Sequence, residues 1–322
     1  MSADAKKRLG ILFLGGAKRV AMARMFRRAC QSYGFECEIY GYELDRRCPL
    51  AAEAEVIEGL RWKDPDLYGS IDEVVAKHGI DIMVPFVDPA VGIAARYAQS
   101  RPGVFVPGSD ASLSDSMFDK AAAAALFELH ELPVPHTYHS GDRIAGLIAK
   151  PRFGSASKGI FPVDSEADLA SLPEPADSYL IQERIDRRCE ITVDCYVSTR
   201  DSRICAVSPR ERLEVSGGEA VRTVTVDDPD TVALARRTLS ALGLKGAVTI
   251  QFIRDLDSGR LLIMEINPRL GGGAVASVHA GADIPRLIVG DAVGDDIRPV
   301  AARPGVLVTR YLEDVVFYPE RS

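Results

Sequence analysis

The stretch that decides the fold of this chain is Met264-Glu265-Ile266-Asn267-Pro268-Arg269, which the glycine run Gly271-Gly272-Gly273 follows closely. Glu265 and Asn267 are two positions apart on a predicted strand, so their side chains point to the same face. Arg269 stands just beyond, where the proline ends the strand. Carboxylate and amide oxygens are ligands that Mg²⁺ prefers, and an arginine can hold developing negative charge. The stretch therefore predicts metal-assisted chemistry on phosphate.

A second strand is predicted to pair with this one in a hairpin. Two apolar runs, 247–253 and 261–267, flank a polar segment with turn chemistry. A turn centred near Ser258 sets Gln251 opposite Glu265, and it sets Thr249 opposite Asn267.

One face of the predicted hairpin is apolar, and the other gathers oxygen-bearing side chains. The apolar face is expected to carry Val248, Ile250, Phe252, Leu262, Met264 and Ile266. The polar face carries Gln251, Glu265 and Asn267, which we interpret as a metal-ligand set. The alternative is a solvated surface hairpin, and a slip of one residue in the register would separate the three.

Composition and charge exclude several classes of protein. A length of 322 residues suggests two or three domains. The net charge of −7, without a basic tract, argues against a nucleic-acid binder. The six cysteines show neither C-x-x-C nor cysteine–histidine spacing, so we expect reduced thiols. The first strand, 11–14, is too short for a signal-peptide core or a membrane span, and we expect a cytoplasmic location without membrane contact.

The N-terminal third alternates strand and helix patterns, which is typical of a doubly wound parallel sheet. Strands are predicted at 9–14, 36–42, 80–85 and 104–106, and helices at 20–33, 70–78 and 90–99. The turn 15–20 does not match G-x-G-x-x-G, which disfavours a dinucleotide site. We expect a tight turn whose following helix N-terminus meets an anionic substrate group. Asp88 follows a strand at the edge where such sheets bind ligands, although it could also serve only as a turn former.

The middle of the chain carries two lysines with a predicted role at phosphate. Lys120 lies in the first turns of a helix predicted at 117–129, where the helix dipole disfavours a cation. A phosphate that binds Lys120 would explain this position. The alternative is that Lys120 is an exposed surface lysine. Residues 114–116 are expected to cap this helix. Lys150 stands on a strand before a small-residue loop, 153–159, and a second strand, 160–163. This loop lacks the lysine of a Walker A motif; it is predicted to fold over phosphates, the alternative being a mobile linker.

Four motifs in this order resemble the ATP-grasp enzymes, and the resemblance spans essentially the whole chain. The likeness is strongest to one synthetase half of the carbamoyl phosphate synthetase large subunit and to related stand-alone ligases, including L-amino-acid ligases and the pyrrolysine-pathway ligase. The motifs are Ser114-Asp115 with Lys120, Lys150-Pro151 with the loop to Gly159, Glu183 with Glu190, and Gln251 with Glu265-x-Asn267-Pro268-Arg269.

The resemblance implies an α/β and α+β fold, in which a Rossmann-like pre-ATP-grasp domain precedes the two lobes of the ATP grasp. The expected boundaries are 1–112 for the pre-grasp domain, 113–182 for the small lobe with its phosphate loop, and 183–322 for the large lobe with the metal and catalytic site.

It also implies roles for individual residues. The nucleotide and its phosphates are expected to contact Lys120, Lys150, Gly154, Ser155, Ser157, Lys158 and Gly159. The adenine edge would be read near Glu183, Arg184 and Ile185, and Glu190 would take the ribose hydroxyls. Two Mg²⁺ ions, with Mn²⁺ as an alternative, would be held by Gln251, Glu265 and Asn267. Many ATP-grasp ligases have an acid at the position of Gln251, but the carbamoyl phosphate branch resembles this chain in having glutamine.

The implied activity is an ATP-dependent carboxylate–amine ligase that works through an acyl phosphate on a small carboxylic acid and an amine. Its expected catalytic residues are Arg269, Arg222 and Arg210, although Arg210 and Arg222 could each instead be surface arginines on a strand. The candidate substrate contacts are Asp88, Gly271, Gly272 and His279. His279 could instead simply pack on a helix, and a homodimer stays open. Three alternatives remain: a carboxylate kinase or carbamoyl-phosphate-type synthetase with another nucleophile, an NAD-linked oxidoreductase, and a non-catalytic ATP-binding protein.

Overall fold

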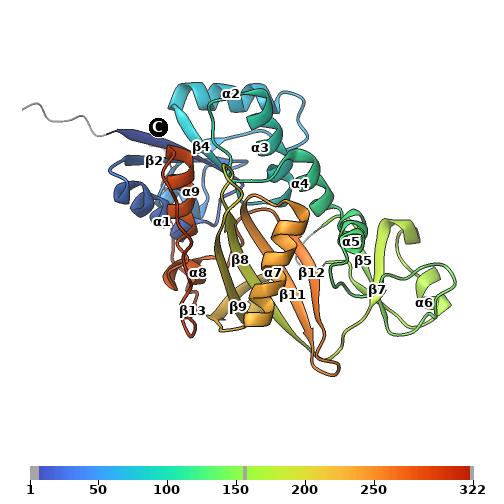
Figure 1. Cartoon of the computed structure of the whole chain (residues 1–322). Coiled ribbons are helices and arrows are strands. Elements are labelled where there is room, and N and C mark those ends of the chain that lie inside the picture. Colours follow the sequence, from blue (N-terminus) through green and yellow to red (C-terminus); the bar gives the residue numbers. More distant parts are fainter. Residues whose placement is uncertain (1–6, 155–157, 320–322) are drawn as a thin grey trace, which may run out of the picture.

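The computed structural model describes residues 7–154 and 158–319. Within these residues the strands form three sheets (Figure 1). A four-stranded sheet holds the N-terminal part, a six-stranded sheet lies at the centre, and a three-stranded sheet stands to one side beyond α5. None of the described helices combines the length and the apolar character needed to cross a bilayer.

The first sheet is parallel, with the strand order β3-β2-β1-β4. Along β1, Ile11 and Phe13 pack with Phe26 of α1, whereas Leu12 and Leu14 pack with α2 and α3 on the other face. Because helices cover both faces of the sheet, this strand is a continuous apolar run. The helices on both faces also confirm the prediction of a doubly wound sheet. The elements are β1 Arg8–Leu14, α1 Val20–Ser32, β2 Glu36–Glu43, β3 Glu55–Glu58, α2 Leu67–His78, β4 Ile80–Pro85 and α3 Asp88–Ser100, with a 3₁₀ turn at Pro49–Ala52.

Three expectations for the following segment were wrong. The strand predicted at 104–106 is only an isolated bridge between Phe105 and Ile82, and Pro107 cannot donate a backbone hydrogen bond to extend it. The helix predicted at 117–129 is two helices, α4 Ala111–Phe118 and α5 Lys120–Leu129. Asp119 separates them because its carboxylate accepts hydrogen bonds from the first backbone amides of α5. The predicted cap 114–116 lies inside α4, whose N-cap is Asp110.

The central sheet is antiparallel, with the order β12-β11-β8-β9-β10-β13. One face is apolar: Val193, Ile250 and Phe252 pack with Leu239 of α7, and Met117 and Phe127 of α4 and α5 join the same core. Figure 1 shows α7 lying along this sheet. The elements are β8 Arg188–Val197, β9 Ile204–Ser216, β10 Glu219–Thr225, α7 Pro229–Leu242, β11 Gly246–Asp255, β12 Leu261–Asn267 and β13 Leu307–Thr309.

The register predicted for the β11–β12 hairpin is confirmed, because Gln251 pairs with Glu265 and Thr249 pairs with Asn267. The predicted apolar face is partly wrong. The register shifts just beyond Gln251, so that Phe252 pairs with Ile263 and Met264 is the extra residue of a bulge. Ile263 therefore enters the core beneath α7, whereas Leu262 and Met264 pack in a separate cluster.

The third sheet has the order β6-β5-β7 and confirms the predicted strand, loop and strand. Near the C-terminus, α9 packs on α1, so the chain returns to the first sheet (Figure 1).

The six cysteines are free. The predicted domain boundaries stay a prediction. The remaining elements are β5 Leu147–Pro151, β6 Phe161–Val163, α6 Glu166–Ala170, a 3₁₀ turn at Ala176–Ser178, β7 Tyr179–Glu183, α8 Val275–His279 and α9 Ile284–Val293.

Candidate functional site

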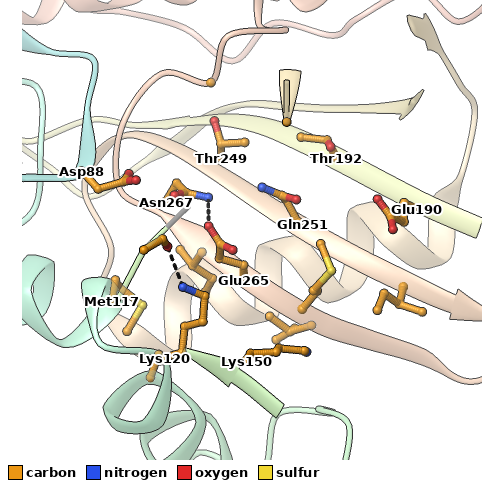
Figure 2. A pocket seen from close by; sticks show the side chains of 18 of the residues that line it. Asp88, Met117, Lys120, Lys150, Glu190, Thr192, Thr249, Gln251, Glu265 and Asn267 are labelled. Atoms are coloured by element: carbon orange, nitrogen blue, oxygen red, sulfur yellow. Dashed lines mark hydrogen bonds between the residues drawn. The ribbon is translucent and has the colours of Figure 1, made fainter. Parts of the chain in front are cut away.

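A cleft of about 450 Å³ opens over the polar face of the central sheet, and residues of all three sheet regions line it. Figure 2 shows the polar side chains of the large sheet on one side, with Lys120 and Lys150 on the other. The large sheet contributes Glu190 and Thr192 from β8, Arg210 and Arg212 from β9, Thr249 and Gln251 from β11, and Glu265 and Asn267 from β12.

The strand pleat produces this polar face. On β8 the buried apolar residues Ile191 and Val193 belong to the core, so the alternate positions 190, 192 and 194 face the other way. Thr192 pairs with Gln251 on one side and with Arg210 on the other, which extends the polar row across neighbouring strands. Directly paired residues share a face, and the row is therefore continuous.

The predicted metal ligands lie together in this row. The amide nitrogen Nδ2 of Asn267 donates to Glu265 Oε1 at 2.8 Å, and Gln251 Oε1 accepts from Arg212 Nη1 at 3.4 Å. The described residues contain no group of three or more histidine, cysteine, aspartate or glutamate side chains suited to a metal ion. A site with one carboxylate and two amide oxygens fits Mg²⁺, which keeps several waters and takes substrate phosphates as further ligands.

Two lysines face these oxygens across the cleft. Lys120, the first residue of α5, donates from Nζ to the carbonyl of Gly154 at 2.7 Å (Figure 2), which ties the helix to the stem of the small-residue loop. Lys150 donates from Nζ to Gln182 Oε1 at 3.1 Å. Burial lowers the pKa of Lys150 to about 8, although the negative charge of Glu265 opposes the shift. Both lysines therefore line the cleft opposite the oxygen-bearing side chains.

The segment predicted to read the nucleoside lines the far end of the cleft. Glu183 is already engaged, because Arg260 donates two hydrogen bonds to it at 2.9 and 2.8 Å and lowers its pKa. Ile185 forms an apolar cluster with Ile253, Leu262 and Met264. The carboxylate of Glu190 accepts from Arg188 at 3.2 Å and from Arg212 at 3.2 Å. Arg184 lines the cleft and pairs with Asp164 and Asp186.

Arg210 is buried, with only 3 % of its surface exposed. Its Nε donates to Asp194 Oδ2 at 2.8 Å, and Asp194 also accepts from Ser277 Oγ at 2.7 Å. Nη1 of Arg210 has no hydrogen-bond partner within residues 7–154 and 158–319. Gly273 lies against the guanidinium, since a Cβ there would stand 2.6 Å from its atoms. A buried cationic donor without a partner suits an anionic ligand.

Arg269 connects the predicted metal ligands to the first sheet. Its Nε donates to Asp88 Oδ1 at 2.5 Å, and its Nη2 donates to Asn267 Oδ1 at 3.2 Å. Asp88 begins α3 beyond the carboxyl end of β4, the edge at which the sequence predicted a ligand. Gly271 and Gly272 also line the cleft.

Other predicted site residues are not brought to the cleft. Arg222 is exposed on β10 because its neighbour Thr223 pairs with Arg212 and shares the cleft face, which turns Arg222 to the opposite face. His279 is exposed at the end of α8 and does not line the cleft. Gly154 and Lys158 do line it, whereas Gly159 lies beside Pro151 and does not. Ser155 and Ser157 lie outside the described residues.

The sequence analysis missed an ion-pair network in the cleft. Arg19, from the first β–α turn, donates to both carboxylate oxygens of Glu219 at 3.3 and 3.0 Å. Although burial opposes it, pairing with Arg19 and Arg310 lowers the pKa of Glu219 to about 2. Asp194 was also missed, and the alternation of polar residues at 190, 192 and 194 could have revealed it. No local signal links Arg19 to Glu219, which are 200 residues apart.

Comparisons with known proteins show what this chain is similar to. The model of a family described as "ATP-grasp in the biosynthetic pathway with Ter operon" matches residues 176–314. The carbamoyl phosphate synthase large chain of Bifidobacterium longum is 23 % identical over 290 residues, which cover 78 % of this chain and 25 % of that protein. That of Bifidobacterium animalis subsp. lactis is 24 % identical over 264 residues, or 72 % of this chain and 23 % of the relative. The chain thus spans about a quarter of the length of these relatives.

Solved structures share the fold. N5-carboxyaminoimidazole synthetase from Staphylococcus aureus superposes with a TM-score of 0.73 at 14 % identity, covering 93 % of this chain and 80 % of that one. The biotin carboxylase domain of 2-oxoglutarate carboxylase from Hydrogenobacter thermophilus gives a TM-score of 0.72 at 16 % identity, covering 92 % and 73 %. The fold predicted from the sequence is therefore confirmed, and the chain has the ATP-grasp fold.

Proposed function

We propose that the chain is an ATP-dependent carboxylate–amine ligase that joins two small metabolites through an amide or peptide bond and releases ADP and phosphate. One observation carries this proposal. A single cleft sets an oxygen-donor row, Gln251, Glu265 and Asn267, opposite Lys120 and Lys150. Oxygen ligands facing ammonium groups provide what a metal–triphosphate complex requires on its two sides.

The nucleotide would lie along the length of the cleft. Lys120, Lys150 and Lys158 would hold its phosphates, and the apolar cluster around Ile185 suits the adenine ring. The backbone N–H of Ile185 has no hydrogen-bond partner in the described part of the chain and could donate to the base. Glu190 would accept from the ribose hydroxyls. Similarity to a structure solved in complex with the magnesium salt of ADP supports both ligands.

Mg²⁺ would be held by Glu265, Asn267 and Gln251, and when bound it would neutralise charge on the phosphate oxygens. The site has one carboxylate, so the phosphates themselves supply much of the metal's coordination. Two ions, or Mn²⁺ in place of Mg²⁺, belong to the same proposal.

The reaction proceeds in two displacements. A carboxylate oxygen of the acid attacks the γ-phosphorus of ATP, the bond to the β-phosphate oxygen breaks, and an acyl phosphate and ADP form. The amine nitrogen then attacks the acyl carbon, phosphate leaves, and the nitrogen loses a proton. Both steps place charge on oxygens, which Arg269 and the unpartnered Nη1 of Arg210 would stabilise.

Bicarbonate is the second candidate acid. The relatives are named carbamoyl phosphate synthases, and one structural neighbour was solved with bicarbonate. The same first step on bicarbonate would give carboxyphosphate and ADP. That neighbour is also described as a dimer, so a homodimer is part of the proposal, as is a cytoplasmic location.

Phosphate release with panels of amino acids, dicarboxylic acids, bicarbonate and amines tests the proposal. We expect release to need both an acid and an amine, and mass spectrometry should show the condensed product. An acid labelled with ¹⁸O in its carboxylate should transfer one ¹⁸O to the released phosphate. Glu265→Gln serves as the control for contaminating ATPases. Release that no acid stimulates, or unlabelled phosphate, contradicts the ligase mechanism, and NADH turnover would favour an oxidoreductase.

A further inference from the structure

A continuous chain of hydrogen bonds leads from the first sheet to the proposed metal ligands. Asp88 accepts from Arg269 at 2.5 Å, Arg269 donates to Asn267 at 3.2 Å, and Asn267 donates to Glu265 at 2.8 Å. Figure 2 shows Asp88 near Asn267 and Asn267 beside Glu265, with the last of these bonds drawn. Asp88 is therefore the outermost member of a network whose inner members are the proposed metal ligands.

The ion pair of Asp88 and Arg269 is largely withdrawn from water. The two side chains are 17 % and 15 % exposed, and they come from positions 181 residues apart in the chain. Asp88 stands in the first turn of α3, where the helix dipole favours a carboxylate. Among the described residues, Arg269 is the only hydrogen-bond partner of the Asp88 side chain. The carboxylate of Asp88 is therefore committed to holding this guanidinium.

Arg269 lies where it could compete with a metal ion. Its Nη2 already occupies Oδ1 of Asn267, the oxygen that would ligate the metal. Glu265 is one hydrogen bond further along, and its Oε2 has no partner within the described residues. A guanidinium without an anchor would pair with this carboxylate, because a planar fork binds a carboxylate through two oxygens. A cation in that position repels a divalent ion.

We propose that Asp88 is a positioning residue that anchors Arg269 and so keeps Glu265 and Asn267 available to the metal that accompanies the nucleotide. The inference rests on the metal site of the proposed function. It assigns to the first sheet a part in metal binding, without requiring Asp88 to touch either the metal or the substrate. Residues that orient metal ligands through a hydrogen bond typically change metal affinity about 10- to 100-fold when they are replaced.

The test compares ADP binding by calorimetry with saturating Mg²⁺ and with EDTA. The dissociation constant in EDTA divided by that in Mg²⁺ gives the factor by which the metal raises the affinity for ADP. We call this factor the gain. In Asp88→Asn we expect this gain to fall by about tenfold, while binding in EDTA stays unchanged. A general structural defect would weaken binding in both conditions. Asp88→Glu, which keeps the charge, should restore part of the gain.

A second variant tests whether the freed guanidinium of Arg269 causes the loss of metal binding. If the freed guanidinium is what excludes the metal, Arg269→Ala in the Asp88→Asn background should return the gain to that of Arg269→Ala alone. Asp72→Asn is the matched control. Asp72, in α2, pairs at 2.5 Å with Arg101, which follows the C-terminal end of α3, and Asp72 lies outside the cleft. It should leave the gain unchanged.

Three outcomes overturn the inference. The gain in Asp88→Asn could equal that of the unaltered chain, or the double variant could bind MgADP as poorly as Asp88→Asn; either result removes the anchoring role alone. Absence of any gain in the unaltered chain contradicts the metal site itself, and the inference falls with it. The first two results leave the ligase proposal intact, so the two failures are distinguishable.

Discussion

A methyl group added at Gly273 should disturb the site through one defined contact. The Cβ of Gly273→Ala would stand 2.6 Å from the guanidinium carbon and both terminal nitrogens of Arg210. Arg210 cannot easily yield, because it is 3 % exposed and its Nε is held by Asp194 at 2.8 Å. The backbone of Gly273 does not require a positive φ, so the whole effect should come from this overlap.

The expected cost follows from the packing. Inserting a methyl group into a closely packed interior costs about 1–3 kcal/mol. For a chain of 322 residues, roughly 1.5 °C of melting temperature corresponds to 1 kcal/mol, which predicts a decrease of roughly 1.5–4.5 °C. Displacement of Arg210 should also lower kcat of the proposed ligase, whereas the KM for ATP should change little because the lysines are untouched.

Thermal unfolding and steady-state kinetics of Gly273→Ala measure both effects. Gly69→Ala is the matched control: Gly69 is exposed in α2, a Cβ there meets nothing within 4 Å, and alanine in a helix should stabilise by about 0.5–1 kcal/mol. In Arg210→Ala, which opens the space, the added methyl should cost nothing further. An unchanged melting temperature and kcat in Gly273→Ala, or an equal loss in both backgrounds, would refute the reasoning.

Three further predictions concern the nucleotide and the metal. Glu265→Gln and Asn267→Ala should each abolish turnover by weakening the metal site, and near-normal rates in both would contradict the metal assignment. Lys120→Ala should raise the KM for ATP because its ammonium and its bond to Gly154 are lost; an unchanged KM removes it from the nucleotide site. Burial lowers the pKa of Lys150 from 10.5 to about 8, so the unfolded chain binds more protons between these values and stability should rise with pH there. Over the same window the KM for ATP should rise as Lys150 loses its charge, and a flat profile in the unaltered chain would refute this.

Much of the hairpin that carries the proposed metal ligands could be predicted from local pattern. Two apolar runs about a turn, with Glu265 and Asn267 on alternate positions, were enough to pair Gln251 with Glu265. The prediction for Leu262 and Met264 failed because a bulge inserts one residue, and periodicity alone does not reveal a bulge. The helix break at Asp119 was missed because several Asp and Ser residues there are equally able to cap a helix.

Some side chains of the cleft could be predicted from the sequence, and others could not. Lys120, Lys150 and Glu190 follow from motif order, whereas Arg222 was misplaced because β9 and β10 pair with register shifts that the sequence does not show. The contacts of Arg210 with Gly273 and of Arg19 with Glu219 join distant segments. Such contacts depend on how the sheets pack, and strand period carries no information about that.

The amino-acid sequence by itself was enough to predict the parallel first sheet, the polar face of the hairpin and, through the order of its motifs, the ATP-grasp fold. These features are local, because alternation along a strand and residue chemistry at a turn act over a few residues. Only the tertiary structure decided that Asp88, at the edge of the first sheet, would hold Arg269 beside Asn267. That contact exists because packing buries both charges at one boundary, and a buried charge needs a partner wherever in the chain it comes from.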